Sequence, residues 1–100
     1  MIDQIKEIAR QVLPVGAHIW LYGSRARGDA RVDSDWDLLI LVDGNHVGTA
    51  EENAFSYPFV RMGWDHKVAI NPQLYTYDEW DMRSASPYYK NVEHDKILIL

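Results

Sequence analysis

The sequence contains no cysteine, which excludes disulfide bonds, thiolate zinc sites and cysteine nucleophiles. Basic residues are also few, because 10 Lys and Arg stand against 15 Asp and Glu and give a formal net charge of −5. A surface with this charge repels nucleic acid, so we do not expect stand-alone binding to DNA or RNA. No apolar run is long enough to span a bilayer, and the first residues lack the basic start and continuous apolar stretch of a signal peptide. We therefore expect a cytoplasmic protein with no membrane partner.

The length of 100 residues predicts one domain, residues 1–100, with its own core but without a separate substrate domain. Any second half of an active site would then come from a partner, and the sequence leaves a homo-oligomer open. The apolar fraction of 47% and the charged fraction of 25% are ordinary for a globular chain. Disorder is therefore not expected.

Hydrophobic periodicity predicts the elements of the first half of the chain. A helix is expected over residues 2–13, a short strand covered on both sides over 17–22, one helical turn over 24–28, a loop over 29–34 and a second strand over 35–42. The run Leu38 to Val42 is apolar on both faces, which is typical of a central, buried strand.

Capping and proline signals organise the second half. Thr49 and Glu52 form a capping-box pattern before a helix that ends at Gly63, and Pro58 within it predicts a kink or two short helices. A third strand is expected over 67–75, with Pro72 at an edge or a bulge. Helices are expected over 76–83, opened by Thr76 and Glu79, and over 87–94, opened by Ser86. Residues 96–100 can add a short strand. This order predicts an α/β sandwich with a small mixed sheet.

The most informative stretch is Gly23 to Val42, where a Gly-Ser turn precedes two acids, Asp35 and Asp37. Residues i and i+2 of a strand share one face, so the two carboxylates should project side by side, about 7 Å apart at their Cα atoms. Such a pair can share a divalent metal, and a glycine-containing turn can offer backbone N–H groups to an anion. Together they predict a site for a metal-bound phosphate compound.

The spacing of these motifs resembles a known family. Gly-Ser-Arg-Ala-Arg-Gly at 23–28 and Ser-Asp-Trp-Asp-Leu at 34–38, followed by similar stretches at 75–80 and 87–93, resemble the minimal nucleotidyltransferases, a branch of the DNA polymerase β-like nucleotidyltransferase superfamily. The resemblance covers nearly the whole chain. It implies an α/β (α+β) nucleotidyltransferase fold, in which helices flank a small mixed β-sheet.

The resemblance also implies a reaction: transfer of a nucleoside monophosphate, AMP expected, from an NTP such as ATP to an acceptor hydroxyl. Asp35 and Asp37 would hold Mg²⁺, with a two-metal site expected and Mn²⁺ as an alternative, while Gly23, Ser24, Arg25 and Arg27 would bind the nucleotide. A competing interpretation of Arg27 is that it pairs with Asp29 or Asp33 to fix the loop. Relatives are often encoded beside a HEPN-type protein as a toxin–antitoxin pair, which implies such a partner here.

The chain departs from the family at one position. Active members generally carry a third acid on the next core strand, and the register of residues 70–76 puts Asn71 there. An amide can coordinate a metal through its oxygen but cannot act as a base, so a second hypothesis is a catalytically weak or inactive module that binds a nucleotide or masks a partner. A third is that the fold serves only as a scaffold. Asp65 would substitute for the missing acid only if the strand began by then.

Other residues that attract attention have simpler interpretations. The four histidines show no pairing that predicts a zinc site. We expect the aromatic side chains of Trp64, Trp80, Tyr88 and Tyr89 to pack helices against the sheet, with an exposed patch for a protein partner as the alternative.

Overall fold

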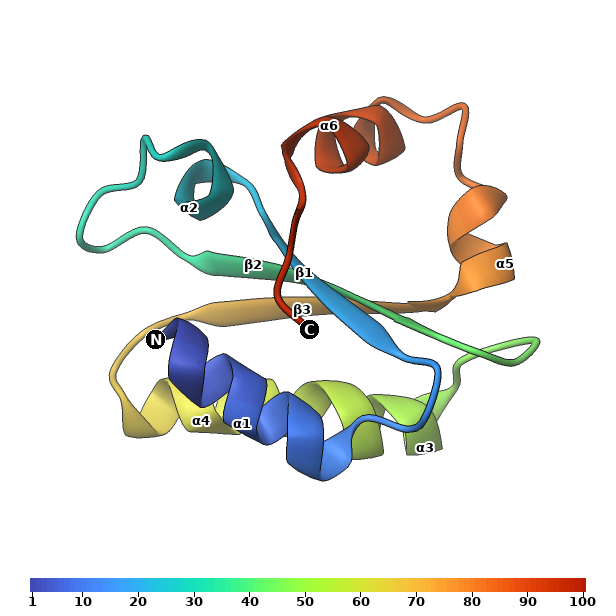
Figure 1. The fold of residues 1–100 in the computed structure, drawn as a ribbon, viewed down its shortest axis with the longest axis horizontal. Helices are drawn as coiled ribbons and strands as arrows, with labels where there is room; N and C mark the ends of the chain where they lie inside the picture. Colours follow the sequence, from blue (N-terminus) through green and yellow to red (C-terminus); the bar gives the residue numbers. More distant parts are fainter.

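The computed structural model describes residues 1–100 and contains a four-stranded mixed sheet between two layers of helices (Figure 1). In chain order the elements are α1 (Ile2–Val12), β1 (His18–Tyr22), α2 (Ser24–Arg27), β2 (Trp36–Val42), α3 (Thr49–Glu51), the π-helix η1 (Glu52–Ser56), α4 (Tyr57–Asp65), β3 (Ile70–Thr76), α5 (Tyr77–Asp81), α6 (Pro87–Asp95) and β4 (Ile97–Leu98). The expected fold class and order of elements are confirmed.

The sheet has the strand order β3-β2-β1-β4. Strand β2 pairs antiparallel with β1 and parallel with β3, while β4 pairs antiparallel with the other side of β1. Pro72 lies in β3, which is an edge strand as its missing N–H requires. Strand β2 is central, and its residues from Leu38 to Val42 are all buried, as predicted.

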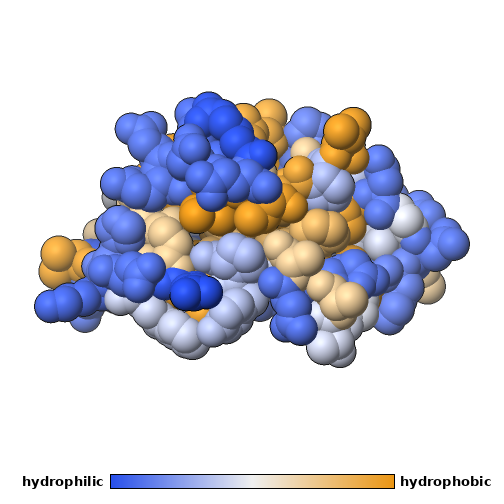
Figure 2. All heavy atoms as spheres, turned by 90° about the horizontal axis from the view of Figure 1, so that it is seen from below, coloured by the Kyte–Doolittle hydropathy of each residue, from blue (hydrophilic) through white to orange (hydrophobic).

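Helices α1 and α4 cover one face of the sheet (Figure 1). This layer contains the larger core, a cluster of 12 buried residues that includes Ile5 of α1, Ile19 of β1, Ile40 of β2 and Phe59 of α4. Seen from this side, the surface shows hydrophobic atoms between groups of hydrophilic side chains (Figure 2). The amphipathic helix predicted for residues 2–13 is therefore confirmed, because α1 buries its apolar side on the sheet.

Helices α5 and α6 cover part of the opposite face, where the buried cluster comprises Leu39, Leu41, Trp80 and Val92. Side chains alternate along a strand, so Trp20 and Tyr22 of β1 also pack on this side, as the predicted alternation requires. Helix α2 lies on the same side as α6, beyond the part of the sheet that α6 covers (Figure 1).

Several predicted boundaries are wrong by a few residues. The helix expected at Thr49 has Gly48 as its N-cap, whose N–H donates to Glu51 at 3.4 Å, so the Thr49/Glu52 capping box does not form. The third strand begins at Ile70 rather than at residue 67, because residues 66–68 turn back on the end of α4 through hydrogen bonds to Gly63 and its neighbours. Strand β2 begins one residue after Asp35.

The segment around Pro58 changes helix type rather than bending alone. Proline lacks the N–H that a regular helix would need there, and the five residues 52–56 before α4 form a π-helix. The predicted division into short helices is confirmed. Downstream, the capping box of Thr76 and Glu79 is present, with Glu79 N donating to Thr76 Oγ1 at 3.0 Å, although α5 ends at Asp81 rather than at residue 83.

None of the helices combines the length and the apolar character that crossing a membrane would require.

Candidate functional site

The two acids lie where the second strand begins, on the face of the sheet that carries α6. Asp37 is opposite Tyr22 in the β1–β2 pairing and beside Asn71 in the β2–β3 pairing. Asp35 precedes the strand by one residue and points to the same group, since Asn71 Nδ2 donates to Asp35 Oδ2 at 2.9 Å and lies 3.4 Å from Asp37 Oδ1. The fold thus brings together the three side chains that the sequence singled out as catalytic.

Gly23 is fitted closely against one of these acids. Its backbone has φ 75° and ψ −157°, a conformation open almost only to glycine. A Cβ added at this position would lie 2.5 Å from Asp37 Oδ2. The turn that carries Gly23 and Ser24 and the carboxylate of Asp37 are therefore neighbours, although they are far apart in the sequence, so a ligand held by the acids also lies beside the turn.

Asp37 is the more enclosed of the two acids. Burial raises the pKa of the Asp37 carboxyl, the hydrogen bond from Asn71 opposes that rise, and the neighbouring carboxylate of Asp35 adds to it. Two carboxylates this close repel each other, and in this arrangement only the neutral amide of Asn71 lies between them. The pair therefore favours a cation.

The donor set fits a hard divalent cation. Nowhere in the chain do three or more His, Cys, Asp or Glu side chains form a metal-binding group, so the third member of this site is an amide. Carboxylate and amide oxygens are ligands of Mg²⁺. The Asn71 amide donates in this structure, and turning it would present its oxygen in place of its N–H groups.

The side chain of Arg25 stabilises the loop between the Gly23–Ser24 turn and the two acids. Its guanidinium donates to the backbone oxygens of Ser34 at 2.8 Å and Val32 at 3.2 Å, and it stacks on the Trp36 ring, 4.4 Å from the centroid. These contacts satisfy much of its donor capacity. Its side chain therefore positions the segment before β2, which contains Asp35.

Arg27 forms two ion pairs at the end of α2. Its Nε lies 3.3 Å from Asp29 Oδ2 and its Nη1 lies 2.7 Å from Asp95 Oδ2 at the end of α6. Of the two partners predicted for Arg27 from the sequence, Asp29 is confirmed and Asp33 is not. The second partner is Asp95, 68 residues along the chain from Arg27. The positive charge of Arg27 also partly opposes the rise in the pKa of the Asp37 carboxyl.

The possibility that Asp65 supplies the missing acid is ruled out by the strand boundary. Asp65 is the last residue of α4, whereas β3 begins at Ile70. A residue outside the strand does not share the alternation that would bring it to the same face.

The family is now defined by a sequence comparison. Residues 2–96 match the model of the nucleotidyltransferase domain. The chain belongs to the nucleotidyltransferase domain family. None of the curated proteins compared with the chain matches it in sequence.

Solved structures share the fold of this nucleotidyltransferase domain. One is a crystal structure of a toxin–antitoxin with AMP-PNP, similar with a TM-score of 0.69 and 18% identity over 99% of this chain and 72% of that chain. Another is a mutant of the toxin–antitoxin MntA–HpeT, with a TM-score of 0.65 and 14% identity over 100% of this chain and 72% of that one. At these identities the similarity shows a shared fold and no more.

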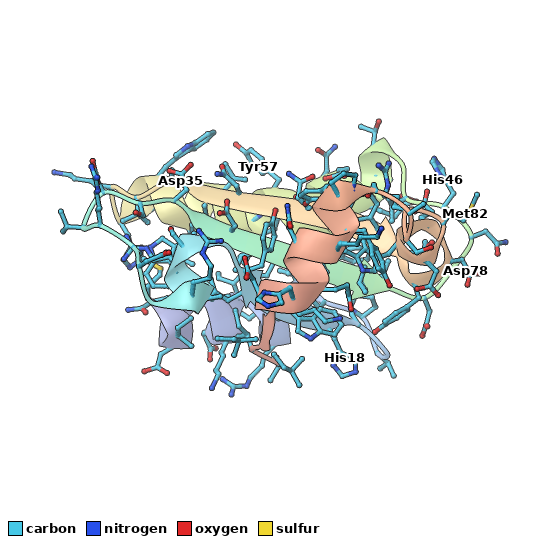
Figure 3. The ribbon with its side chains drawn as sticks, turned by 90° about the horizontal axis from the view of Figure 1, so that it is seen from above. His18, Asp35, His46, Tyr57, Asp78 and Met82 are labelled. Atoms are coloured by element: carbon cyan, nitrogen blue, oxygen red, sulfur yellow. The ribbon has the colours of Figure 1, made fainter.

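The acid site of the nucleotidyltransferase domain is an open surface rather than a cavity. The largest hollow, about 580 Å³, is lined by His46, Tyr75, Met82 and other residues at the opposite end of the sheet, and Figure 3 shows His46 and Met82 far from Asp35. Asp35 and Asn71 are both exposed. An open site suits a reaction in which another molecule completes the enclosure.

Sequence reasoning missed a pair of tyrosines beside the acids. The hydroxyls of Tyr22 and Tyr88 are 2.9 Å apart, and their rings meet edge to face. Burial raises the pKa of both phenols, and the charge of Asp37 adds to the rise at each of them. The strand alternation placed Tyr22 on one face but could not show that β1 pairs with β2 at Asp37.

The aromatic residues expected to pack helices divide into two groups. Trp80 is 2% exposed and stacks with Tyr89, whose ring centroid is 4.8 Å away, so the prediction is confirmed for these two. Tyr88 of α6 also packs as predicted, with its ring centroid 5.8 Å from that of Trp80 and its ring edge to face with Tyr22 of β1. The prediction is wrong for Trp64, which is 62% exposed on α4 and meets Tyr57 instead of the sheet.

Proposed function

We propose that this nucleotidyltransferase domain transfers a nucleoside monophosphate, with AMP expected, from an NTP to a hydroxyl group of a partner protein. The hydroxyl oxygen forms a bond to the α-phosphorus, the bond from that phosphorus to the oxygen that bridges it to the β-phosphorus breaks, and pyrophosphate leaves. The observation that carries the proposal is the meeting of Asp35, Asp37 and Asn71 beside the Gly23 turn. The family to which the chain belongs supports a transferase. The neighbours of similar fold add a nucleotide analogue and a toxin–antitoxin setting.

Charge makes a divalent cation part of this proposal. A triphosphate cannot approach two carboxylates closely unless a cation lies between them, because all these groups are negative. Asp35 and Asp37 would hold Mg²⁺, which when bound neutralises charge on the reacting phosphate and lowers the pKa of an attacking hydroxyl. Mn²⁺ is the alternative ion for the same oxygen ligands.

The turn at residues 23–24 would receive the phosphates. Gly23 has no side chain to obstruct their approach, and the Ser24 hydroxyl, which has no hydrogen-bond partner within the chain, would add a donor. Arg27 would contribute positive charge from the last position of α2. Arg25 donates to the loop, so its proposed contribution includes holding Asp35 in place as well as binding phosphate.

The acceptor is proposed to belong to a partner. Asp35 and Asn71 are exposed, so this chain does not enclose an acceptor hydroxyl beside them. A HEPN-type protein, encoded beside many minimal nucleotidyltransferases, is the partner we propose. Modification or masking of that protein would form a toxin–antitoxin pair.

The alternative is a module that binds a nucleotide with little or no transfer. Asn71 favours it, because the amide donates hydrogen bonds to both acids where active relatives have a third carboxylate. An amide cannot take the proton from an attacking hydroxyl. The base would then have to come from the partner or from solvent.

Labelled nucleotide separates these functions. The protein is incubated with Mg²⁺ and ATP radiolabelled at the α-phosphate, with and without the candidate partner, and labelled protein is measured on a gel. We expect partner labelling that Asp35→Ala abolishes and Asp78→Ala preserves, since Asp78 is an exposed acid at the other end of the sheet (Figure 3). Nucleotide binding without transfer to any partner would favour the module, and a protein without Mg²⁺-dependent nucleotide binding would favour a scaffold.

Asn71→Asp tests the role of the amide directly. If the third acid is missing from a working site, this substitution should raise the transfer rate by about 10²-fold or more, the usual contribution of general-base catalysis. Asn71→Ala should not raise it, because alanine supplies neither base nor ligand. An unchanged rate in Asn71→Asp would show that Asn71 does not occupy the third-acid position.

A further inference from the structure

The hydroxyl pair of Tyr22 and Tyr88 joins the acid site to helix α6. Tyr22 is the last residue of β1, directly before Gly23, and Tyr88 lies in the first turn of α6. Their oxygens are 2.9 Å apart and their rings are nearly perpendicular, at 80°. The contact therefore links the turn proposed to receive phosphates with the helix above the sheet.

The pair borders the carboxylates. Tyr22 is directly opposite Asp37 in the antiparallel β1–β2 ladder. Residues directly opposite in such a ladder project on the same face with Cβ atoms about 4.5–5.5 Å apart. A ligand bound at Asp37 would therefore meet this pair on the side that faces α6.

One phenolic proton of the pair has no acceptor within the chain. Two hydroxyls carry two protons, and the single hydrogen bond between them uses one. Neither oxygen has another hydrogen-bond partner in the chain, so the second proton is not used within the chain. When Tyr22 donates to Tyr88, the spare proton is on Tyr88, which is 38% exposed, whereas Tyr22 is half-buried.

The two positively charged donors near the acids are already engaged. Arg25 donates to the loop oxygens of Val32 and Ser34, and Arg27 is paired with Asp29 and Asp95. The tyrosine pair is thus an uncharged donor that needs no ion pair to be broken before it can bind an anion.

We propose that the Tyr88 hydroxyl, oriented by Tyr22, donates a hydrogen bond to an oxygen of the nucleoside triphosphate bound at Asp35 and Asp37. Tyr88 is then a nucleotide-binding residue and Tyr22 a positioning residue. The proposal rests on the proposed function, since it requires a nucleotide at the acids. It adds a contact from α6, which would couple the helix to occupation of the site.

Binding measured by calorimetry tests it without depending on transfer. The ligand is an ATP analogue with a methylene bridge between the α and β phosphorus atoms, in the presence of Mg²⁺. Tyr88→Phe should weaken binding roughly fivefold to tenfold, the usual effect of losing one hydrogen bond. Tyr22→Phe should weaken it less, about twofold, because Tyr88 keeps its donor but loses its orientation.

Tyr89→Phe is the matched control, because Tyr89 is the next residue of α6 and its hydroxyl makes no hydrogen bond in the chain. Its affinity should equal that of the unchanged protein. Circular dichroism of each variant verifies the fold, and Tyr22→Phe provides a second test of the same contact if Tyr88→Phe unfolds. Inorganic tripolyphosphate identifies the oxygen: a loss of affinity shared with this ligand assigns the contact to phosphate, whereas a loss seen only with the nucleotide assigns it to the nucleoside.

Two results would overturn the proposal, and they are distinguishable. If the unchanged protein binds the analogue and Tyr88→Phe binds it equally well, the contact is wrong while the proposed function stands. If the unchanged protein does not bind the analogue at all, the proposed function fails and this contact fails with it.

Discussion

A single glycine sets how closely the turn and the acid site approach each other. Replacing Gly23 with alanine would force an unfavourable backbone conformation and put a Cβ 2.5 Å from Asp37 Oδ2. We expect Gly23→Ala to destabilise the protein by about 1–3 kcal/mol, because of this strain. It should also abolish measurable Mg²⁺-dependent nucleotide binding in calorimetry, since the carboxylate must move aside.

Gly28→Ala separates the two effects of that substitution. Gly28 has a similar positive φ of 84°, but an added Cβ would meet no atom within 4 Å. This variant should lose about 1 kcal/mol, the cost of a left-handed alanine, while binding nucleotide normally. Equal binding by both variants would show that the approach of Gly23 to Asp37 has no part in the site.

Asn71 partly offsets the repulsion between the two acids when no metal is present, because its amide donates to them. Asn71→Asp removes the amide donor to Asp35 and adds a third negative charge. We expect a lower melting temperature without metal, equivalent to about 1 kcal/mol, and a larger rise on adding Mg²⁺ than the unchanged protein shows. Thermal melts with and without MgCl₂ measure both, and Asn91→Asp on the exposed side of α6 should change neither. A Mg²⁺ response equal to that of the unchanged protein would argue against a metal at this site.

At the scale of the elements, α6 is attached to α2 by one ion pair. The side chain of Asp95, at the end of α6, is 11% exposed and accepts a hydrogen bond from Arg27 Nη1 at 2.7 Å. The hydrogen bond from Arg27, and after it that from His94, lowers the pKa of the Asp95 carboxyl below its ordinary value of 3.8. The stabilisation is therefore complete above that ordinary value, which applies to the unfolded chain, and is lost as the pH falls through the lowered pKa of the folded protein.

Asp95→Asn should remove this stabilisation. We expect the variant to melt below the unchanged protein at pH 7, and the difference in melting temperature to shrink steadily below about pH 4. Asp81→Asn, which removes an exposed acid of α5 without an ion pair, serves as the control and should melt with the unchanged protein at every pH. A difference that persists at pH 2 would indicate that Asp95 acts through something other than its charge.

Local signals predicted the elements well, whereas contacts between residues far apart in the sequence could not be predicted. The Ser86 and Thr76 caps and the buried run of β2 could be found because each depends on residues a few positions apart. The Arg27–Asp95 ion pair spans 68 residues, and no periodicity or motif indicates it. The Tyr22–Tyr88 contact likewise depends on where α6 crosses the sheet. The third strand began late for a local reason that the pattern does not show, the turn after α4.

At the scale of the whole molecule, the two helical layers are unequal. The layer of α1 and α4 contains a cluster of 12 buried residues, whereas the layer of α5 and α6 has a cluster of 4, of which the helices contribute only Trp80 and Val92. Burial of apolar surface is the main stabilising contribution to each layer. The smaller layer should therefore open more readily than the larger one.

Hydrogen–deuterium exchange measured by mass spectrometry tests this difference. Peptides from α6 should exchange through local opening, well before those from α4 and β2, which should exchange only with global unfolding. Adding Mg²⁺ and the methylene-bridged ATP analogue should slow exchange in α6, because the Tyr88 contact would tie the helix to the nucleotide, and Tyr88→Phe should reduce that protection. If α6 already exchanged as slowly as β2, the helix would be part of the rigid core, and the inequality of the two clusters would not control its opening. If α6 opens early but gains no protection from the nucleotide, then α6 is a mobile cover that the ligand does not hold.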